Sequence, residues 1–337
     1  MRVIYRYFSL CLLITLVVVQ TNAAQGLTPQ PIPAIDGLFK AFDDYPLVAI
    51  AEFHGIRQLD DLYIDMIRDP RFAAEVGNIV LEFGNAYYQD VIDQYVNGET
   101  VLFEDLERVW TPTFAAGYDP VPYAVYELYA AIRMVNAALP PESRIRVWLG
   151  DPPLNPATVP QSEIDAPRDR DLHYARILTD QILAHGKKAL VVMGAFHLDP
   201  AGFPFLLGNF FTIFMGDTRN VRQIVEELAP RQMYVATVYQ GMPNAECATA
   251  VESAFAGQEV PAIISLQSTP LVEMINRPEC RDYPTQIAQI PEQFQAGWGH
   301  GLLYIAPTES LTMSMLHPYE PPVSYLDFIA LLAQESE

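Results

Sequence analysis

The chain has 337 residues, of which 50% are hydrophobic and 18% are charged, a composition typical of a globular protein with ample material for a core. Aspartate and glutamate number 41 against 20 lysines and arginines, which gives a formal net charge of -21. A surface of this sign repels polyanions, so the composition argues against nucleic-acid binding.

The first residues have the layout of a secretory signal peptide. Arg2 and Arg6 form a short basic start, Phe8–Val19 an apolar stretch, and Thr21–Ala24 a small-residue cleavage region. The apolar stretch is shorter than the roughly 20 residues that a membrane span needs. We therefore predict that residues 1–24 are removed and that the mature protein is exported, periplasmic or extracellular, without a stable membrane span. The alternative is an uncleaved N-terminal anchor.

Cys247 and Cys280 are the cysteines that remain after such a cleavage. Two cysteines in an exported chain are candidates for one disulfide, and the sequence leaves open whether they meet. Both lie in the C-terminal third of the chain, away from the polar residues described below, so we interpret them as structural.

After a proline-rich lead-in, Leu27–Pro33, short apolar stretches rich in β-branched residues alternate with longer helical patterns. The predicted strands are Leu47–Glu52, Asn78–Phe83, Ile145–Gly150, Ala189–Gly194, Phe210–Met215, Tyr234–Tyr239, Ala262–Leu266 and Leu302–Ala306. The predicted helices are Gln58–Ile67, Tyr88–Val96, Pro122–Ala138, Asp169–His185 and Val221–Leu228. Several strands are almost continuously apolar, as in strands that are covered on both faces. The alternation predicts an α/β fold in which helices flank a mostly parallel central sheet.

The longest segment between predicted strands runs from Gly84 to Arg144 and carries two or three helical patterns with many aromatic residues. We predict a helical insertion at about residues 84–144, after the second strand. The sequence has no internal repeat and no convincing linker. Residues 25–337 are therefore predicted to form one α/β domain.

Ionisable residues follow the first four predicted strands at the points where these strands end. Glu52 and His54 follow the first strand, Glu82 lies at the end of the second, Asp151 follows the third and His197 follows the fourth. The carboxyl ends of parallel strands share one edge of a sheet, where open α/β folds place their ligand crevice. We therefore expect these residues to converge in space although they are distant in sequence.

Two histidines with two or three carboxylates permit two kinds of chemistry. They can bind a divalent metal ion that polarises water. Without a metal, His54 or His197 can act as a general base whose orientation a carboxylate fixes. Arg57, just after His54, can neutralise a carboxylate or hold an anionic group. The structural alternative is that the carboxylates cap helices or pair with arginines.

Other patterns narrow the function. The sequence contains no G-x-S-x-G elbow, H-E-x-x-H helix, P-loop, G-x-G-x-x-G or C-x-x-C-H motif. These absences argue against a serine-elbow hydrolase, a zincin metalloprotease, a nucleotide-binding enzyme and a covalent c-type haem protein. His185 precedes Gly186 at a predicted helix end, where an imidazolium complements the helix dipole. His300 precedes a late strand, and it would lie at the opposite edge of the sheet if that strand is parallel.

Three short motifs resemble those of a bacterial superfamily that unites erythromycin-esterase-like proteins, Tiki-type metalloproteases and ChaN-like haem-binding lipoproteins. They are "AEFHG" from Ala51, "IVLEFGN" from Ile79 and "VVMGAFHL" from Val191. By position, the family's Gly-Glu-x-His-type motif corresponds to Ala51–His54, its second-strand glutamate to Glu82 and its Gly-x-x-His motif to Gly194–His197. Alanine replaces the usual glycine of the first motif, and the spacing from glutamate to histidine is that of the haem-binding and Tiki branches.

The resemblance implies water activation by histidine and glutamate in the esterase-like branch, a divalent metal and peptide hydrolysis in the Tiki branch, and haem binding in the ChaN branch. We predict an exported hydrolase for a small ester or peptide. The predicted catalytic residues are His54, Glu52, Glu82, His197, Arg57 and Asp151, and the ligands of an assisting metal would be Glu52, His54, Glu82 and His197. The alternative is a ChaN-like uptake protein that binds haem or a metal ligand through His54 and His197 without catalysis. The substrate, the choice of metal or haem and the oligomeric state stay open.

Overall fold

The computed structural model describes residues 29–52, 54–110, 123–160, 162–163, 169–198, 219–242, 244–267, 269–275, 277, 280, 299–314, 323–328 and 330. The predicted signal peptide, residues 1–24, and the predicted strand Phe210–Met215 lie outside these ranges. Within the described residues, no helix is both long and apolar enough to cross a membrane.

An eight-stranded sheet in the order β1-β7-β8-β6-β2-β5-β3-β4 forms the centre of the fold. Its strands are β1 (Ile32–Pro33), β2 (Leu47–Glu52), β3 (Asn78–Asn85), β4 (Arg146–Asp151), β5 (Ala189–Gly194), β6 (Met233–Val238), β7 (Ala262–Ser265) and β8 (Gly301–Tyr304). β8, β6, β2, β5, β3 and β4 run parallel, whereas β7 is antiparallel to β8 and to β1. The predicted α/β fold with a mostly parallel sheet is confirmed.

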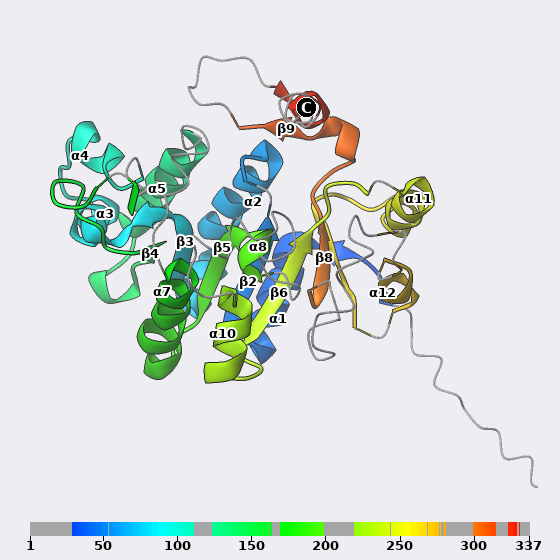
Figure 1. The fold of residues 1–337 in the computed structure, drawn as a ribbon, viewed down its shortest axis with the longest axis horizontal. Coiled ribbons are helices and arrows are strands. Elements are labelled where there is room, and N and C mark those ends of the chain that lie inside the picture. The colour runs from blue at the N-terminus through cyan, green and yellow to red at the C-terminus, as the bar shows by residue number, and fades with distance from the viewer. Residues whose placement is uncertain are drawn as a thin grey trace, which may run out of the picture.

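Helices cover both faces of this sheet (Figure 1). One face packs against α1 (Ala34–Asp44), α2 (Arg57–Arg68), α3 (Gln89–Val96), α4 (Phe103–Glu107) and α5 (Tyr123–Asn136). The other face packs against α7 (Arg170–Arg176), the π-helix Ile177–Ile182, α8 (Ala195–Leu198) and α10 (Val221–Leu228). α11 (Ala245–Ala254) and α12 (Pro270–Ile275) cover β7 and β8. The helices α3 to α5 lie in the predicted insertion between β3 and β4.

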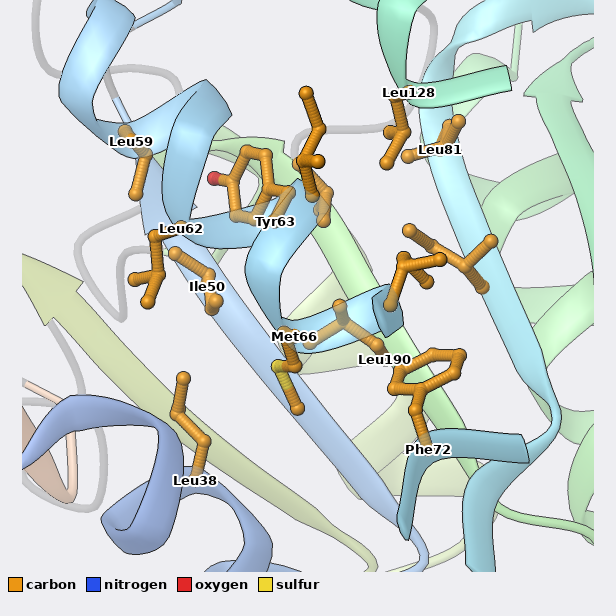
Figure 2. Packing of buried hydrophobic residues seen from close by; sticks show 14 of the residues in the cluster. Leu38, Ile50, Leu59, Leu62, Tyr63, Met66, Phe72, Leu81, Leu128 and Leu190 are labelled. Carbon is orange, nitrogen blue, oxygen red and sulfur yellow. The ribbon is translucent and has the colours of Figure 1, made fainter. Parts of the chain in front are cut away.

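Side chains of the central strands alternate between the two layers, as the pleat requires. In β2, Val48 and Ile50 belong to the core under α2, whereas Leu47 and Ala49 belong to the core under α10. Figure 2 shows Ile50 on the same side as Met66 of α2. All six residues of β2 are buried, and the five that precede Glu52 are apolar, as expected of a strand that is covered on both faces.

The structure has the predicted bounds for β2, β5 and α10 and shifts most other predicted ends by one or two residues. The predicted helix Asp169–His185 consists of three parts: α7, the π-helix Ile177–Ile182 and the 3-10 turn Leu183–His185. The helices α1 and α11 and the short helices α8 and α12 are not among the predicted elements. Alanine, threonine and cysteine give α11 a weak apolar stripe, and the Asn244 side chain, which accepts from the Glu246 and Cys247 N–H groups, marks its start instead.

Two features lie around the C-terminal third of the chain. Cys247 in α11 and Cys280 form a disulfide with Cα atoms 5.6 Å apart, so the pair left open by the sequence is joined. β9 (Thr312–Met313) and β10 (Val323–Ser324) form a separate two-stranded sheet. β9 lies beside the start of α2 (Figure 1), where Met313 pairs with Ile56.

Candidate functional site

Neighbouring strands deliver the predicted residues to one edge of the sheet. Glu52 ends β2, Glu82 lies near the end of β3, Asp151 ends β4 and His197 lies in α8 directly after β5. Because β2, β5, β3 and β4 are consecutive neighbours, their carboxyl ends meet at the same place. The structure therefore brings together Glu52, Glu82 and His197, with His54 beside them.

His54 lies between two glutamates. Its Nδ1 is 2.9 Å from Glu52 Oε1, and its Nε2 is 3.3 Å from Glu82 Oε2. The side chain is 35% exposed, so solvent reaches the ring. Burial opposes a charge here, but Glu82 and Glu52 overcome it and raise the pKa of His54 to about 10. At neutral pH both ring nitrogens therefore carry protons directed at carboxylates.

His197 has the same arrangement in a buried setting. Its Nδ1 is 2.8 Å from Asp171 Oδ1, and its Nε2 is 3.1 Å from Glu82 Oε1. The side chain is only 3% exposed. Burial again opposes the charge, and Asp171 with Glu82 raises the pKa of His197 to about 9. The second carboxylate oxygen of Asp171 accepts from the Val221 N–H, which ties this pair to the start of α10.

Glu82 joins the two histidines. One carboxylate oxygen faces His197 and accepts from Arg170 Nη2 at 3.0 Å, and the other faces His54 and accepts from the Gly194 N–H at 2.6 Å. Burial would raise the pKa of Glu82, yet the cations around it hold that pKa well below its ordinary value. A Cβ at Gly194 would lie 2.9 Å from His54 Nε2, so the backbone can approach this closely only as glycine.

Asp151 belongs to the same network through Arg170 and not through a histidine. Its Oδ1 accepts from Arg170 Nε and from the Tyr174 hydroxyl, both at 2.6 Å. Burial raises the pKa of Asp151, although Arg170 opposes the shift. Its Oδ2 is buried and has no hydrogen-bond partner among the described residues. The structure thus gives Asp151 a supporting position behind Glu82.

The predicted site residue Arg57 lies outside this network. Its guanidinium pairs with Asp61 at 2.7 Å and with Glu127 of α5, and its side chain is 36% exposed. Glu52 is held from this side by Tyr63 of α2, whose hydroxyl donates to Glu52 Oε2. Arg57 is the first residue of α2, and its pairs with Asp61 and Glu127 direct its side chain along the helix surface.

Sequence reasoning missed the residues that hold the network: Arg170, Asp171, Tyr174 and Tyr63. Arg170 is 1% exposed and lies between Glu82 and Asp151. The repeated charges in "RDRDLHY", from Arg168, read as a solvated helix face, and periodicity alone does not reveal that two of them point inward. The available signal was the excess of carboxylates at the sheet edge, because several buried carboxylates require a buried cation.

A metal ion or haem iron would need a free lone pair on a ring nitrogen. Both nitrogens of His54 and of His197 face carboxylates instead. Across the described part of the chain, no group of three or more His, Cys, Asp or Glu side chains is arranged to hold a metal ion. The predicted ligands Glu52, His54, Glu82 and His197 are therefore not arranged as a metal site. A proton from water likewise needs a ring nitrogen of His54 that has lost its own proton and turned away from its carboxylate.

Comparisons with known proteins bear on the fold. No protein-family model matches the sequence, and no curated protein matches it. The structure is similar to the crystal structure of a Bacillus cereus protein, with a TM-score of 0.53 and 11% identity over 86% of this chain and 97% of that chain. It is also similar to ChaN of Campylobacter jejuni, a structure of cofacial heme binding, with a TM-score of 0.39 and 11% identity over 65% of this chain and 94% of that chain. At this identity the first likeness shows the fold alone, and the second is too low to carry an argument, so the family resemblance of the motifs stays a prediction.

Proposed function

We propose that the protein is an exported hydrolase in which His54 transfers the proton of an attacking water during cleavage of a small ester or peptide. The observation that carries the proposal is a solvent-reachable imidazole held between Glu52 and Glu82 at the carboxyl edge of a parallel sheet. A carboxylate on each side fixes the ring and stabilises the imidazolium that forms when the ring accepts a proton. No metal is needed for this step.

The buried half of the network has a supporting role in this proposal. Arg170 holds Glu82 from behind, and His197 shares the same carboxylate. Glu82 therefore keeps its charge and its orientation toward His54 whatever the ring's protonation state. Side chains that position a base in this way make the difference between a surface histidine and a catalytic one.

Export is part of the proposal. The disulfide between Cys247 and Cys280 is the type of bond that persists in oxidising compartments. It agrees with the signal-peptide layout of the first residues, and both observations support a periplasmic or extracellular location.

The test is hydrolysis of a panel of small chromogenic esters and short peptides by the purified protein. We expect His54→Ala to lower kcat by about 10²–10⁴-fold, the usual contribution of a general base. The control is His185→Ala, because His185 is an exposed histidine in the 3-10 turn Leu183–His185 and is not one of the proposed site residues. Unchanged turnover in folded His54→Ala would remove this residue from the mechanism.

The pH dependence gives a second test. A general base must be unprotonated, and the pKa of His54 is about 10. We therefore expect kcat/KM to rise with pH from neutrality toward about pH 10. A rate that falls over this interval would mean that His54 acts as the protonated species instead.

Haem binding by His54 or His197 is the competing function, and like proton transfer from water it needs a ring nitrogen that is released from its carboxylate. A haem titration separates the two functions without any substrate. A shift of the Soret band that His54→Ala or His197→Ala abolishes would favour the haem carrier, and its absence would remove that alternative.

A further inference from the structure

A contact between α2 and the C-terminal segment Ser310–Ser314 lies directly beside His54. The Ser314 N–H donates to the Gly55 carbonyl at 2.6 Å, and the Ser314 hydroxyl donates to Asp60 Oδ2. The partners Asp60 and Ser314 are 254 positions apart in the sequence. Gly55 has a φ of 83°, in the left-handed region, and it follows His54 directly. One serine therefore fixes both the turn after His54 and the first turn of α2.

Gln58 makes a second set of contacts to the same segment. Its Nε2 donates to the Ser310 carbonyl at 3.0 Å and to Thr312 Oγ1 at 3.2 Å, and its Oε1 accepts from the Thr312 N–H at 3.0 Å. Residues 310, 312 and 314 thus contact α2, from the end of the 3-10 turn Thr308–Ser310 and along β9. Leu311 between them is buried in the core. The hydrogen bonds to Gln58 and the burial of Leu311 fix the segment Ser310–Ser314 against α2.

Asp60 links these contacts to the proton-transfer site. The charges of Glu52, Arg57 and Asp61 act on its carboxylate. Burial, with the charge of Glu52, raises the pKa of Asp60 to about 7, and the Ser314 hydroxyl opposes this shift. The Ser314 hydroxyl thereby favours a charged Asp60 next to the carboxylate that holds His54.

We propose that Ser314 and Asp60 are positioning residues of the His54 site, which hold the His54–Gly55 turn against Glu52. The assignment rests on the function proposed for His54, because positioning matters only where the ring performs chemistry. Loss of the Ser314 hydroxyl removes the side-chain half of the contact and leaves Asp60 without a donor. The turn then opens more often, and the His54 Nδ1–H leaves the Glu52 carboxylate more often.

The test measures solvent exchange of the ring N–H protons by NMR at a fixed pH in the full, purified protein. In Ser314→Ala we expect the His54 Nδ1–H to exchange at least about tenfold faster, the factor that corresponds to a weakened hydrogen bond to a charged group. The His197 Nδ1–H, held by Asp171 on the other side of Glu82, serves as the internal standard and keeps its rate. Ser314→Thr retains a hydroxyl and should restore the slow exchange.

Ser310→Ala is the matched control, because the Ser310 hydroxyl donates to Pro307 in its own turn and not to α2. Gln58→Ala tests the second set of contacts and should accelerate exchange at His54 as well, which keeps the proposal testable if Ser314→Ala does not fold. Unchanged exchange at His54 in both Ser314→Ala and Gln58→Ala would overturn the assignment. Equal acceleration at His54 and His197 would also overturn it, because it would indicate general loosening.

The exchange measurement needs no substrate, so its outcome is independent of hydrolysis. In an ester assay, Ser314→Ala should lower kcat and leave KM unchanged. A wild-type protein without turnover would count against the proposed function, and the exchange rates would still decide whether Ser314 and Asp60 position His54.

Discussion

The carboxyl ends of the strands carry different kinds of residue in the two halves of the sheet. Around β2, β5, β3 and β4, the carboxyl ends carry an ion network centred on Glu82. Around β6 and β8, they carry stacked rings: Tyr239 lies 5.6 Å and Phe255 lies 4.6 Å from the Tyr304 ring centre. The same kind of strand end is therefore a charged site in one half and a packed aromatic cluster in the other. Position at the edge makes chemistry possible, and the residues that surround it decide whether chemistry occurs.

The histidines of the two halves show the same contrast. His197, in the charged half, faces two carboxylates and has a raised pKa. His300, in the aromatic half, stacks on Tyr234 at 5.2 Å, and its Nδ1 accepts from the Val235 N–H. Burial and the nearby Arg222 lower the pKa of His300 to about 4. His197 is buried and His300 partly buried, and their partners make His197 a cation and leave His300 neutral at neutral pH.

The strongest way to break the charged half is to remove its buried cation. Arg170→Met leaves the Glu82 and Asp151 carboxylates without their shared partner, and we expect a loss of about 3–5 kcal/mol in the free energy of unfolding. Urea denaturation measures this loss. Arg219→Met, which removes an exposed pair with Glu227, should change the free energy of unfolding by no more than about 1 kcal/mol. Similar losses in the two variants would mean that the network is not the stabilising unit we describe.

The aromatic half depends on a covalent link. Replacement of Cys247 and Cys280 by alanine removes a cross-link between positions 33 residues apart, and the expected loss is about 3–4 kcal/mol in the free energy of unfolding. Denaturation under non-reducing conditions measures it, with the wild type in reductant as the comparison. Two free thiols in the denatured, unreduced protein would contradict the disulfide.

The sequence was sufficient to predict the charged edge. Apolar stretches revealed β2 and β5 with their bounds, because strands covered on both faces are apolar along most of their length. Once these strands are assumed parallel, the convergence of Glu52, Glu82 and His197 follows from topology. The start of α10 at Val221 was also predicted, and the structure shows the capping box that fixes it, in which the Asn220 side chain accepts from the Gln223 N–H.

The residues that support the charged edge could not be predicted from strand patterns and topology. Arg170 and Asp171 have the composition of an exposed helix face, and only the packing of α7 on the sheet turns them inward. The contact between Asp60 and Ser314 joins segments 254 positions apart, which no local pattern records. Arg57 shows the converse, since proximity to His54 in the sequence did not direct its side chain to Glu82 and it pairs with Asp61 and Glu127.

The opposite pKa shifts predict opposite pH dependences for the two halves. The pKa of His197 is raised from 6.5 to about 9, so its contribution to stability is present below about pH 6.5 and is lost as pH rises toward 9. The pKa of His300 is lowered to about 4, so its contribution is present above about pH 6.5 and is lost as pH falls toward 4. We expect the effect of each histidine on the free energy of unfolding to be on the order of 3 kcal/mol at most.

Unfolding curves recorded from pH 4 to 10 check this prediction in three proteins, which are the wild type, His197→Gln and His300→Gln. The difference between wild type and His197→Gln should shrink on the alkaline side, and the difference between wild type and His300→Gln should shrink on the acid side. Parallel curves for the two variants would show that the surroundings of the rings do not differ as we infer.

The smallest expected effect comes from the same substitution made in each half. A tyrosine hydroxyl donates to a glutamate in both, from Tyr63 to Glu52 and from Tyr304 to Glu252. Glu252→Gln keeps an acceptor for its tyrosine and should cost about 1 kcal/mol in the free energy of unfolding. Glu52→Gln also weakens the bond to the His54 imidazolium, because a neutral amide replaces a carboxylate that neutralises it. Its loss should exceed that of Glu252→Gln by about 1 kcal/mol in urea denaturation near neutral pH. Equal losses would mean that His54 draws no stabilising charge from Glu52, and the contrast between a charged half and a packed half would then not extend to this residue.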